Sequence, residues 1–476
     1  MPVAVKHSPT GLTFAVLAAG AGFFAVLQSL VSPVLSTIQH DLHTDQGTVT
    51  WLQTGYLLSA SIFTPILGRV GDMVGKQRTL VATLAVLALG CLLAAVAPNI
   101  AVLLVARTIQ GAGGAVFPLS FGIIRDEFPP ARVSSAVGTI SAIIAAGGGL
   151  GIVLAGPVVS TLGIHWLFWI PAIVVAITAV AAGRYVPESP IRTPGRINWA
   201  AAMLLTAWLV ALLLPVSKAP AWGWGSTRVI SLLVVAAVLF AAWVVAEARS
   251  ANPLIDMRMM RLPAVWPTNA VALLFGGAMF AVLAFVPVFA QTPTAAGYGF
   301  GASVTESGLL MLPMLVTMFI AGFFSGRMDR FFGPKAQLVA CSALSVVACG
   351  MLTLAHDQRW QIAVAAGALG LGTGLAFSAM ANLIVHNVPP HQTGVATGMN
   401  ANIRTIGGAM GTAAMASVVT AHPRPDGLAR EAGFVSGFVL LTVLSIGAVA
   451  AALAVKTPRQ DFTSLSQDAR LPAVER

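Results

Sequence analysis

The stretch GRVGDMVGKQR, residues 68–78, decides the fold, because it separates two long apolar runs near residues 48–68 and 79–97. Each run has the roughly 20 mostly apolar residues that a membrane-spanning helix needs. Gly68 and Gly75 permit a tight hairpin between the runs, since glycine adopts backbone conformations that other residues avoid. The stretch therefore predicts two membrane helices joined by a short turn.

The same stretch carries a charge pattern that recurs later in the chain. Asp72 precedes the basic residues Lys76 and Arg78, and an anion is favoured beside such residues and near helix N-termini. The stretch GRMDRFFGPK, residues 326–335, repeats the order glycine, aspartate (Asp329), glycine and basic residue, with a spacing that differs by one. The repetition predicts two parallel six-helix halves related by an axis along the membrane normal.

The composition is that of a membrane protein. Of the 476 residues, 57% are hydrophobic and only 9% are charged, against roughly 25% charged residues in a soluble domain. The net charge of +10 does not indicate a nucleic-acid partner, because Lys and Arg are scattered between apolar runs and form no basic stripe. The cysteines Cys91, Cys341 and Cys349 lie inside apolar runs, so we expect packing residues and no disulfide or metal site.

Hydropathy predicts an all-α polytopic membrane protein with fourteen transmembrane helices. The long unbroken apolar runs exclude the ten-residue alternation of a β-barrel. The first run, which begins at Leu12, is too long for a cleavable signal peptide. The expected spans lie near residues 12–37, 48–68, 79–97, 100–123, 135–160, 166–184, 198–216, 229–247, 264–290, 305–325, 336–355, 361–385, 394–420 and 433–455.

The distribution of Lys and Arg among the loops predicts the orientation, because basic loops stay in the cytosol. With both termini inside, 19 of the 26 Lys and Arg lie on inner segments and 5 on outer ones. We expect an N-terminal six-helix bundle, an inserted pair made of spans seven and eight with its cytosolic linkers, a C-terminal six-helix bundle and a cytosolic tail. The corresponding boundaries are residues 1–186, 187–262, 263–456 and 457–476.

These motifs resemble those of a known family of transporters. Residues 68–78 are similar to the signature loop of the major facilitator superfamily, in which Gly-x-x-x-Asp-x-x-Gly precedes basic residues. Residues 104–111, Leu-Val-Ala-Arg-Thr-Ile-Gln-Gly, are similar to its fourth-span signature, Arg-x-x-Gln-Gly. The fourteen expected spans and the phrase NPLIDMR at residues 252–258 resemble the drug:proton antiporter branch typified by the EmrB and QacA exporters.

The resemblance implies the major facilitator fold in a bacterial plasma membrane, with alternating access to a central cavity near the bilayer midplane. It implies export of drug-like or antibiotic compounds in exchange for protons, without a cofactor, metal or nucleotide. It also implies a cytosolic gate; an alternative is that the basic loop only sets the topology. The gate residues would be Gly68, Asp72, Gly75, Lys76, Arg78 and Asp329.

Two features depart from the family pattern. The fifth-span motif of the antiporters is Gly-x-x-x-Gly-Pro-x-x-Gly-Gly, whereas residues 147–157 read GGGLGIVLAGP, with a displaced Gly-Pro pair and no final Gly-Gly. The glycines still permit close contact between helices. Gln28 stands in the first span where many relatives carry an aspartate, which removes an obvious proton site.

Two arginines lie within the expected spans, where a charge costs at least ~2.5–3.5 kcal/mol and marks a functional candidate. Arg107 shares a helix face with Gln110, and Arg404 shares one with Asn400 and several glycines, so both should point into the bundle. For either arginine the alternative is a structural hydrogen-bonding role. The expected cavity residues are Gln28, Gln53, Tyr56, Arg107, Gln110, Asn269, Asn400 and Arg404.

No acidic residue is expected in the middle of a span. Glu306, at the outer start of the tenth, is the nearest candidate for a proton site, although Ser303-Val-Thr-Glu306 also matches a helix capping box. A cavity with two arginines and no carboxylate predicts a neutral, zwitterionic or anionic substrate.

The predicted function is secondary active transport, with a small-molecule substrate, protons and the lipid bilayer as partners. The alternative is a facilitator or symporter for a metabolite. An enzyme is not expected, because the spans hold no grouping of nucleophile, base or metal ligands. Transport driven by ATP is not expected either, since Gly-x-x-x-x-Gly-Lys-[Ser/Thr] is absent. A channel would need a filter-like loop or a ring of charges, and neither is found.

Overall fold

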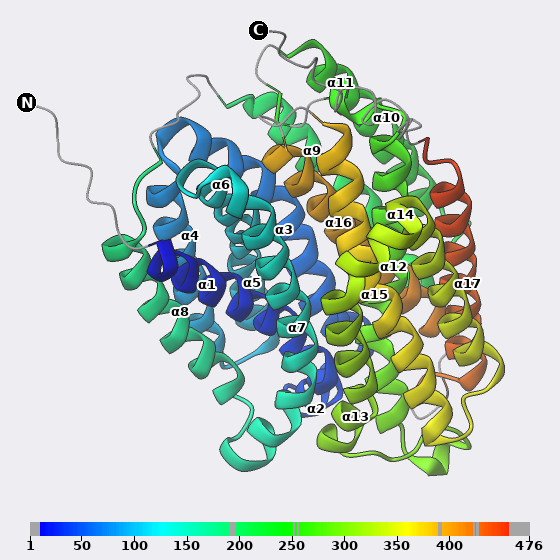
Figure 1. The fold of residues 1–476 in the computed structure, drawn as a ribbon. Coiled ribbons are helices and arrows are strands. Elements are labelled where there is room, and N and C mark those ends of the chain that lie inside the picture. Colours follow the sequence, from blue (N-terminus) through cyan, green and yellow to red (C-terminus); the bar gives the residue numbers. More distant parts are fainter. Residues whose placement is uncertain are drawn as a thin grey trace, which may run out of the picture.

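The structure is a computed structural model, and it describes residues 10–189, 197–250, 253–254, 257–388, 393–421, 424 and 428–456. These residues form helices and connecting turns, with no strand among them (Figure 1). Twelve helices of the described part are long and apolar enough to cross a membrane. The chain is therefore a multi-pass, all-α membrane protein.

The count of twelve is lower than the fourteen expected from the sequence, because two long helices fall outside it. One is α7 (Pro130–Leu162), of which only Ala146–Leu162 counts, as a shorter apolar helix. The other is α16 (Thr393–Val419), which carries Asn400, Asn402 and Arg404. Such polar residues lower the hydropathy of a helix whether they face lipid or protein.

The first half of the chain forms one group of helices, coloured blue to cyan in Figure 1. Its first span bends after α1 through the short η1 into α2, and its fourth span is broken into α5 and α6 by the glycine-rich η2. The elements are α1 (Thr10–Leu30), η1 (Ser32–Val34), α2 (Leu35–Asp41), α3 (Gln46–Val74), α4 (Lys76–Ala95), α5 (Ile100–Gln110), η2 (Gly111–Ala115), α6 (Val116–Glu127), α7 and α8 (Trp166–Tyr185).

The second half forms the other group, coloured green to red. The helix α12 lies at its centre and is buried along nearly its whole length. The helix α14 holds two spans, because Gly333 interrupts it with a φ of 75°. The elements are α11 (Met257–Met260), α12 (Val265–Gln291), η3 (Thr294–Ala296), α13 (Val304–Leu310), α14 (Leu312–Leu354), α15 (Arg359–Asn387), α16 and α17 (Glu431–Leu453).

The two loops that look alike in sequence turn in the same way. A single glycine at positive φ reverses the chain in each, Gly75 at 132° and Gly333 at 75°. The prediction that Gly68 also takes part in the hairpin is wrong, because α3 continues to Val74 and Gly68 lies inside it. One residue without a side chain is enough for the turn, since only glycine adopts these φ values at little cost.

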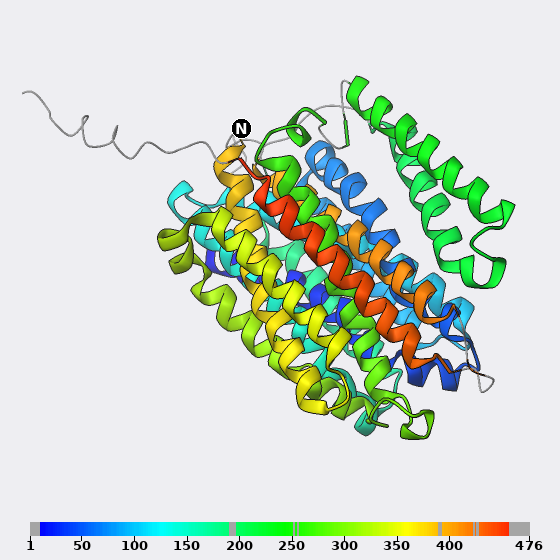
Figure 2. The same ribbon diagram turned by 90° about the vertical axis from the view of Figure 1, so that its right-hand side faces the viewer.

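The helices α9 (Trp199–Trp222) and α10 (Thr227–Arg249) pack against each other beside the two groups (Figure 2). The helix α9 contacts α3 of the first half and α16 of the second, so the pair covers the seam between them. Trp208 of α9 packs on Phe240 and Trp243 of α10, with ring centroids 5.0 and 6.0 Å apart. The remaining surface of α10 is largely exposed and apolar, as expected for a helix that faces lipid.

The glycines of α7 face two different neighbours. A side chain at Gly147 or Gly151 would collide with the backbone of α1, within the same half. A side chain at Gly149 or Gly156 would collide with Leu315 or Thr305 of the other half. The displaced fifth-span glycines therefore let α7 approach both partners closely, as small residues do in membrane helix pairs.

Candidate functional site

A cavity of about 70 Å³ lies between the two halves of the molecule. Its walls come from α1, α3, η2, α6 and α7 on one side, and from α12, α14, α15 and α16 on the other. The predicted residues Gln28, Gln53 and Arg404 line it. Arg404 is the only charged residue among those that line it, and none of them is Asp or Glu.

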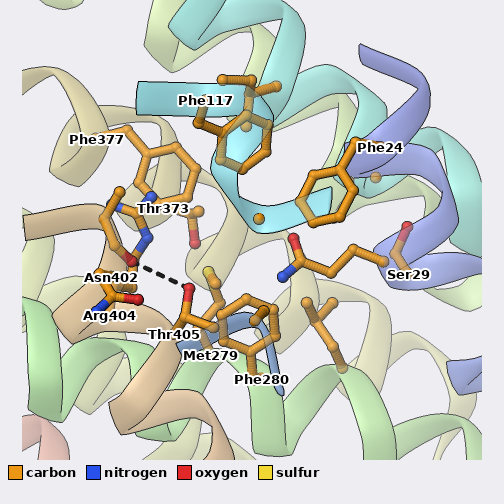
Figure 3. Close-up of a pocket in the computed structure, with 18 of the residues that line it drawn as sticks. Phe24, Ser29, Phe117, Met279, Phe280, Thr373, Phe377, Asn402, Arg404 and Thr405 are labelled. Atoms are coloured by element: carbon orange, nitrogen blue, oxygen red, sulfur yellow. Dashed lines mark hydrogen bonds between the residues drawn. The ribbon is translucent and has the colours of Figure 1, made fainter. Parts of the chain in front are cut away.

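Aromatic and sulfur-containing side chains make up much of the cavity wall. Figure 3 shows Phe377 on one side of the cavity and Phe24 on the other, with Phe117 and Phe280 between them. The rings of Phe24 and Phe117 meet edge to face at 5.1 Å. Three methionines, Met279, Met314 and Met318, complete the apolar surface. Such a wall suits flat apolar molecules and adapts to their outline.

The guanidinium of Arg404 lies over the ring of Phe377, 4.1 Å from the centroid. Glycines at the contact between α12 and α16 let the two backbones approach closely beside Arg404. A side chain at Gly276 of α12 would collide with the carbonyl oxygen of Arg404, and one at Gly407 would collide with Leu273. The expectation that Arg404 points into the bundle along a glycine-lined helix contact is thus confirmed.

Two amide side chains in the cavity wall lack hydrogen-bond partners. Gln53 is buried and its Oε1 has none, and Asn402 is buried with neither Oδ1 nor Nδ2 bonded. Asn402 also lines a second cavity, of about 140 Å³, towards the end that holds the α3–α4 turn, here called the inner end. Buried polar groups without partners are uncommon in native proteins and indicate a ligand or water site. Sequence analysis did not single out Asn402, although it lies two residues before Arg404.

Arg107, Gln110 and Tyr56 do not line the central cavity in this structure but form a cluster inside the first half. Arg107 is fully buried; its Nε donates to the Leu52 carbonyl oxygen at 3.1 Å and its Nη1 to Gln110 Oε1 at 2.8 Å. Gln110 Nε2 donates in turn to the Gly90 carbonyl oxygen at 3.2 Å. The guanidinium lies 4.1 Å from the Tyr56 ring centroid. The cluster links α3, α4 and α5. This arrangement agrees with the alternative that Arg107 has a structural hydrogen-bonding role.

Asn269 and Asn400 bond to each other between α12 and α16. Asn400 Nδ2 donates to Asn269 Oδ1 at 2.9 Å, and Asn269 Nδ2 lies 3.2 Å from the sulfur of Met260. Both residues are buried and neither lines the central cavity. The pair connects two helices of the second half, because an amide inside a membrane bundle needs a partner.

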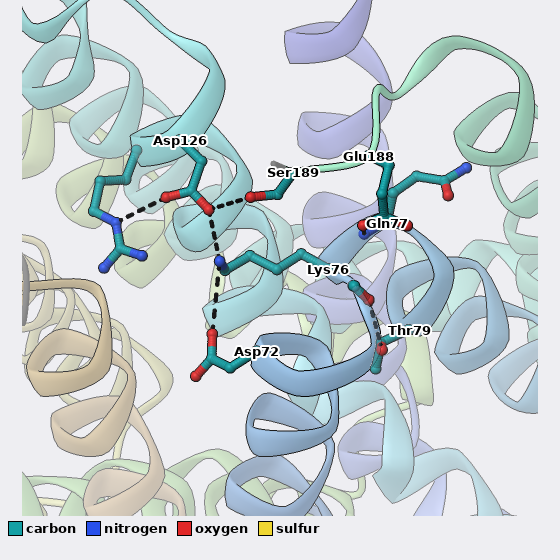
Figure 4. Close-up of polar contacts among 9 residues, drawn as sticks. Asp72, Lys76, Gln77, Thr79, Asp126, Glu188 and Ser189 are labelled. Atoms are coloured by element: carbon teal, nitrogen blue, oxygen red, sulfur yellow. Dashed lines mark hydrogen bonds and ion pairs between the residues drawn. The ribbon is translucent and has the colours of Figure 1, made fainter. Parts of the chain in front are cut away.

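The predicted gate region forms a charged cluster at the inner end (Figure 4). Lys76 Nζ lies 2.6 Å from Asp126 Oδ2 and 3.6 Å from Asp72 Oδ1. Asp126 is fully buried and also accepts hydrogen bonds from Arg125 Nε at 3.1 Å and Ser189 Oγ at 2.5 Å. Asp126 is thus the main partner of Lys76, a role that the sequence did not reveal because 50 residues separate them.

The segment that follows α8 returns to the same turn. Glu188 Oε1 accepts a hydrogen bond from the backbone N–H of Gln77 at 3.2 Å, and Glu188 Oε2 lies 3.6 Å from Arg78 Nε. The carboxylate thereby satisfies an N–H group at the start of α4, where a negative charge is stabilised. The acidic and hydroxyl residues directly after the eighth helix, Glu188 and Ser189, are the signal that could have indicated this contact.

The other predicted gate residues are placed as follows. Gly68, Asp72 and Lys76 line the inner cavity, together with Gly398 and Met399 of α16. Gly75 forms the turn, and Arg78 is exposed. The side chain of Asp329 lies outside the described residues.

Glu306 lies at the opposite, outer end and does not line the central cavity. It forms the capping box expected from the sequence: Ser303 N donates to Glu306 Oε2 at 2.8 Å, and Glu306 N donates to Ser303 Oγ at 3.1 Å. Arg359 Nη1 lies 3.3 Å from Glu306 Oε1. The carboxylate is half exposed, so these contacts are those of a surface helix cap.

One group among the described residues has the spacing of a metal site. The ligand atoms of His356, Asp357 and Glu431 lie within 4.8 Å of one another. His356 Nε2 is 3.2 Å from Glu431 Oε1, and this contact links the start of α17 to the connection between α14 and α15. An ordinary hydrogen bond accounts for this geometry without a metal ion.

Comparison with known proteins identifies the family. The model of the Major Facilitator Superfamily matches residues 17–412 and 292–472. The chain is 29% identical to the tetracenomycin C resistance and export protein of Streptomyces glaucescens, over 87% of this chain and 78% of that protein. It is 29% identical to the methylenomycin A resistance protein of Streptomyces coelicolor, over 87% and 86% of the two chains. It is 27% identical to multidrug resistance protein 3 of Bacillus subtilis, over 83% and 77%.

The fold is shared with a solved structure. The crystal structure of the human organic anion transporter MFSD10 (TETRAN) superposes with a TM-score of 0.68 at 15% identity, and the match covers 93% of this chain and 99% of that one. At that identity the likeness concerns the fold alone. The motifs, the two groups of helices and the family match agree: this chain belongs to the Major Facilitator Superfamily of membrane transport proteins.

Proposed function

We propose that the protein is a secondary active transporter that exports drug-like or antibiotic compounds across the bacterial plasma membrane in exchange for protons. The observation that carries the proposal is the central cavity, which is lined by both halves and has a charged cluster at its inner end. The similarity to three proteins named for drug resistance or export favours compounds of that kind over nutrients.

The proposed topology has fourteen spans, with both termini in the cytosol. The helices α7 and α16 have 33 and 27 residues, which gives lengths of about 50 and 40 Å and exceeds a hydrocarbon core of about 30 Å. Asn400 and Arg404 of α16 face the protein interior, so lipid does not meet them. The division into residues 1–186, 187–262 and 263–456 follows, with the inserted pair α9–α10 between the bundles and residues 457–476 as the tail.

The proposed mechanism is alternating access, in which the two halves rock about the cavity. At the outer end Gln291 Nε2 of α12 donates to the Pro33 carbonyl oxygen at 2.6 Å. At the inner end α16 approaches α6 so closely that a Cβ on Gly398 would lie 3.0 Å from Pro118 Cβ. The cavity of about 70 Å³ is small compared with drug sites of about 300–1,000 Å³. Binding and release therefore require the halves to separate.

The inner gate is proposed to act through Lys76. This ammonium group holds Asp126 of α6 beside Asp72 of α3, so it keeps the inner ends of the two helices together. Gly75 supplies the turn, and Gly68 leaves space beside α16. Arg78 attaches the turn to the segment after α8 through Glu188. Asp329 is proposed to take the matching position in the second half.

The proton carrier is proposed to lie outside the central cavity. Gln28 cannot titrate, and no residue lining the cavity is a carboxylic acid. We propose Glu306 as the candidate at the outer end, where protonation would release Ser303 and Arg359. The absence of a carboxylate from the cavity wall also favours the second candidate function, a facilitator or symporter for a metabolite.

The test begins with a susceptibility panel in a pump-deficient host, using cationic, neutral and anionic compounds. An exported compound is then followed in everted vesicles with an imposed inside-acid gradient, and we expect uptake that ends when the gradient is collapsed. Uptake that ignores the gradient would exclude proton antiport and favour the facilitator. Glu306→Gln should uncouple uptake from the gradient, whereas Asp41→Asn, at another exposed carboxylate, should not.

A further inference from the structure

We infer that the central cavity selects planar aromatic compounds that carry an anionic oxygen group, such as a carboxylate or phenolate, and that Arg404 binds this group. The inference rests on the proposed export function and names the substrate class of the same cavity.

The wall of the central cavity carries one positive charge, which belongs to Arg404. Arg404 has no ion-pair partner among the described residues, and no carboxylate lines the wall beside it. A guanidinium stays protonated in proteins. Within a low-dielectric interior an uncompensated cation attracts an anion far more strongly than it does in water. A ligand with one negative group therefore neutralises the cavity, whereas a cationic ligand adds a second like charge.

The contact with Phe377 prepares Arg404 for a planar anion. The ring lies against the guanidinium at 4.1 Å and restricts its orientation. The cation–π contact holds the guanidinium beside the ring, and its N–H groups make no hydrogen bond to the described residues. Two parallel N–H groups match the two oxygens of a carboxylate, which is why arginine and not lysine suits such a site.

The rest of the wall suits a flat ring system. Phe24, Phe117 and Phe280 stand around the cavity from different helices (Figure 3). Aromatic rings stack or meet edge to face with aromatic ligands at low conformational cost. Figure 3 shows Arg404 beside Phe377 at one side of the cavity and Phe24 across from them, so a ligand can reach the cation with one end and the rings with the other.

The unpaired amides add a requirement for further polar groups. Gln53 Oε1 needs a donor, and Asn402 has both a donor and an acceptor without partners. A buried polar group without a partner costs about 1–3 kcal/mol. Hydroxyl and carbonyl substituents on the ligand would satisfy these groups. The preferred substrate is therefore a hydroxylated or carbonyl-bearing aromatic acid, and a plain hydrocarbon cation is the poorest match.

Three probes with one ring system test the inference: anthracene-2-carboxylate, anthracene-2-carboxamide and anthracen-2-yl-trimethylammonium. Their binding to the purified full-length protein is measured by fluorescence titration. We expect the carboxylate to bind about 10- to 100-fold more tightly than the carboxamide, which is the range for a charge-assisted pair. The trimethylammonium compound should bind most weakly.

The variant Arg404→Gln should reduce carboxylate affinity to that of the carboxamide and leave carboxamide affinity unchanged. Phe377→Leu should weaken all three probes, and the carboxylate most. Arg228→Gln removes an exposed charge at the start of α10, so it serves as the control for net charge and should change nothing. Retained binding of the carboxamide shows that a variant is folded.

The inference is overturned if the wild-type protein binds the trimethylammonium probe most tightly or does not distinguish the three. It is also overturned if Arg404→Gln keeps the preference for the carboxylate. If that variant does not fold, the order of the three probes on the wild-type protein decides. Export of cationic compounds alone would overturn this inference and leave the proposed export function standing. If the three probes bind in the expected order but no compound is exported, the inference about the substrate class stands and the proposed export function is overturned.

Discussion

Arg107 and Arg404 are the two cations within the expected spans, and their surroundings differ. Arg107 of α5 is fully buried in the first half and makes two hydrogen bonds besides its contact with Tyr56. Arg404 of α16 is half-buried at the cavity and has Phe377 as its contact. The first arginine uses its N–H groups to connect helices, whereas the second makes no hydrogen bond to the described residues and is proposed to bind a ligand. The role of a charge in a membrane bundle thus depends on its partners.

The difference has an energetic consequence. Hydrogen bonds to a charged group contribute about 1.5–3 kcal/mol each, so Arg107 stabilises the packing of α3, α4 and α5. Among the described residues Arg404 makes a cation–π contact with Phe377 and no hydrogen bond or ion pair through its side chain, and such a contact is worth about 0.5–2 kcal/mol. Substitutions around the two residues should therefore separate stability from substrate recognition.

The largest effect is expected for Arg107→Ala. The change removes a hydrogen bond to the Leu52 carbonyl oxygen and leaves Gln110 Oε1 without its donor in a buried site, at a cost of about 3–5 kcal/mol. We expect loss of transport and a thermal midpoint lower by several degrees, with the protein still inserted in the membrane. Cys91, Cys341 and Cys349 are buried and free, so a thiol-reactive dye reports the unfolding. Arg404→Ala is the matched control, and an equal loss of midpoint in both variants would contradict the comparison.

An intermediate effect is expected for Gln110→Leu. The change removes the acceptor of Arg107 Nη1 and the donor to the Gly90 carbonyl oxygen, which costs about 1–3 kcal/mol. The thermal midpoint measured with the same dye should fall between those of the wild type and Arg107→Ala. Combining the two substitutions should add little, because both break the same contact. A fully additive double variant would show that they act independently.

A smaller effect of opposite sign is expected for Asn402→Leu at the cavity. The amide has no partner in the folded protein, so its replacement by an apolar side chain of similar size should leave stability unchanged or raise it by about 1 kcal/mol. Binding of a polar aromatic acid should weaken about tenfold, which fluorescence titration measures. A clear loss of stability would indicate that Asn402 supports the fold.

The smallest effect is expected for Tyr56→Phe. The hydroxyl of Tyr56 is buried without a partner, while the ring carries the contact with Arg107. Stability should therefore stay within about 0.5 kcal/mol of the wild type. Tyr56→Leu removes the ring itself and should cost about 2 kcal/mol or more. A large effect of Tyr56→Phe would mean that the hydroxyl bonds a water or another group.

Much of the fold could be predicted from the sequence, because bilayer thickness fixes the length of an apolar helix. The repeated order of glycine, aspartate and glycine also predicted the two loops, and each loop turns at one glycine, Gly75 or Gly333. The helix α16 is not among the twelve spans counted in the described part of the chain, since a helix inside a bundle can carry polar residues that lower its mean hydropathy. The cavity was predicted in part: Gln28, Gln53 and Arg404 line it.

The inner cluster could be predicted only in part. Asp72 at the end of α3 and Lys76 at the start of α4 are four residues apart across the Gly75 turn, so their contact is local. Asp126, Glu188 and Ser189 come from α6 and the segment after α8, and the fold alone brings them to the turn. Separation along the chain hides such pairs, because hydropathy and motif spacing describe neighbours in sequence and not in space.

The sequence by itself determined that the chain is an all-helical membrane protein and predicted two related halves, since helix length, glycine turns and loop charge follow from local chemistry and the bilayer. The tertiary structure decided which side of each helix meets which neighbour. That choice placed Arg107 in a hydrogen-bonded cluster and Arg404 at the cavity. The physical reason is that α5 and α16 look alike in sequence around their arginines. Only the packing of α5 against α3, and of α16 against α12 and α15, distinguishes the two sites.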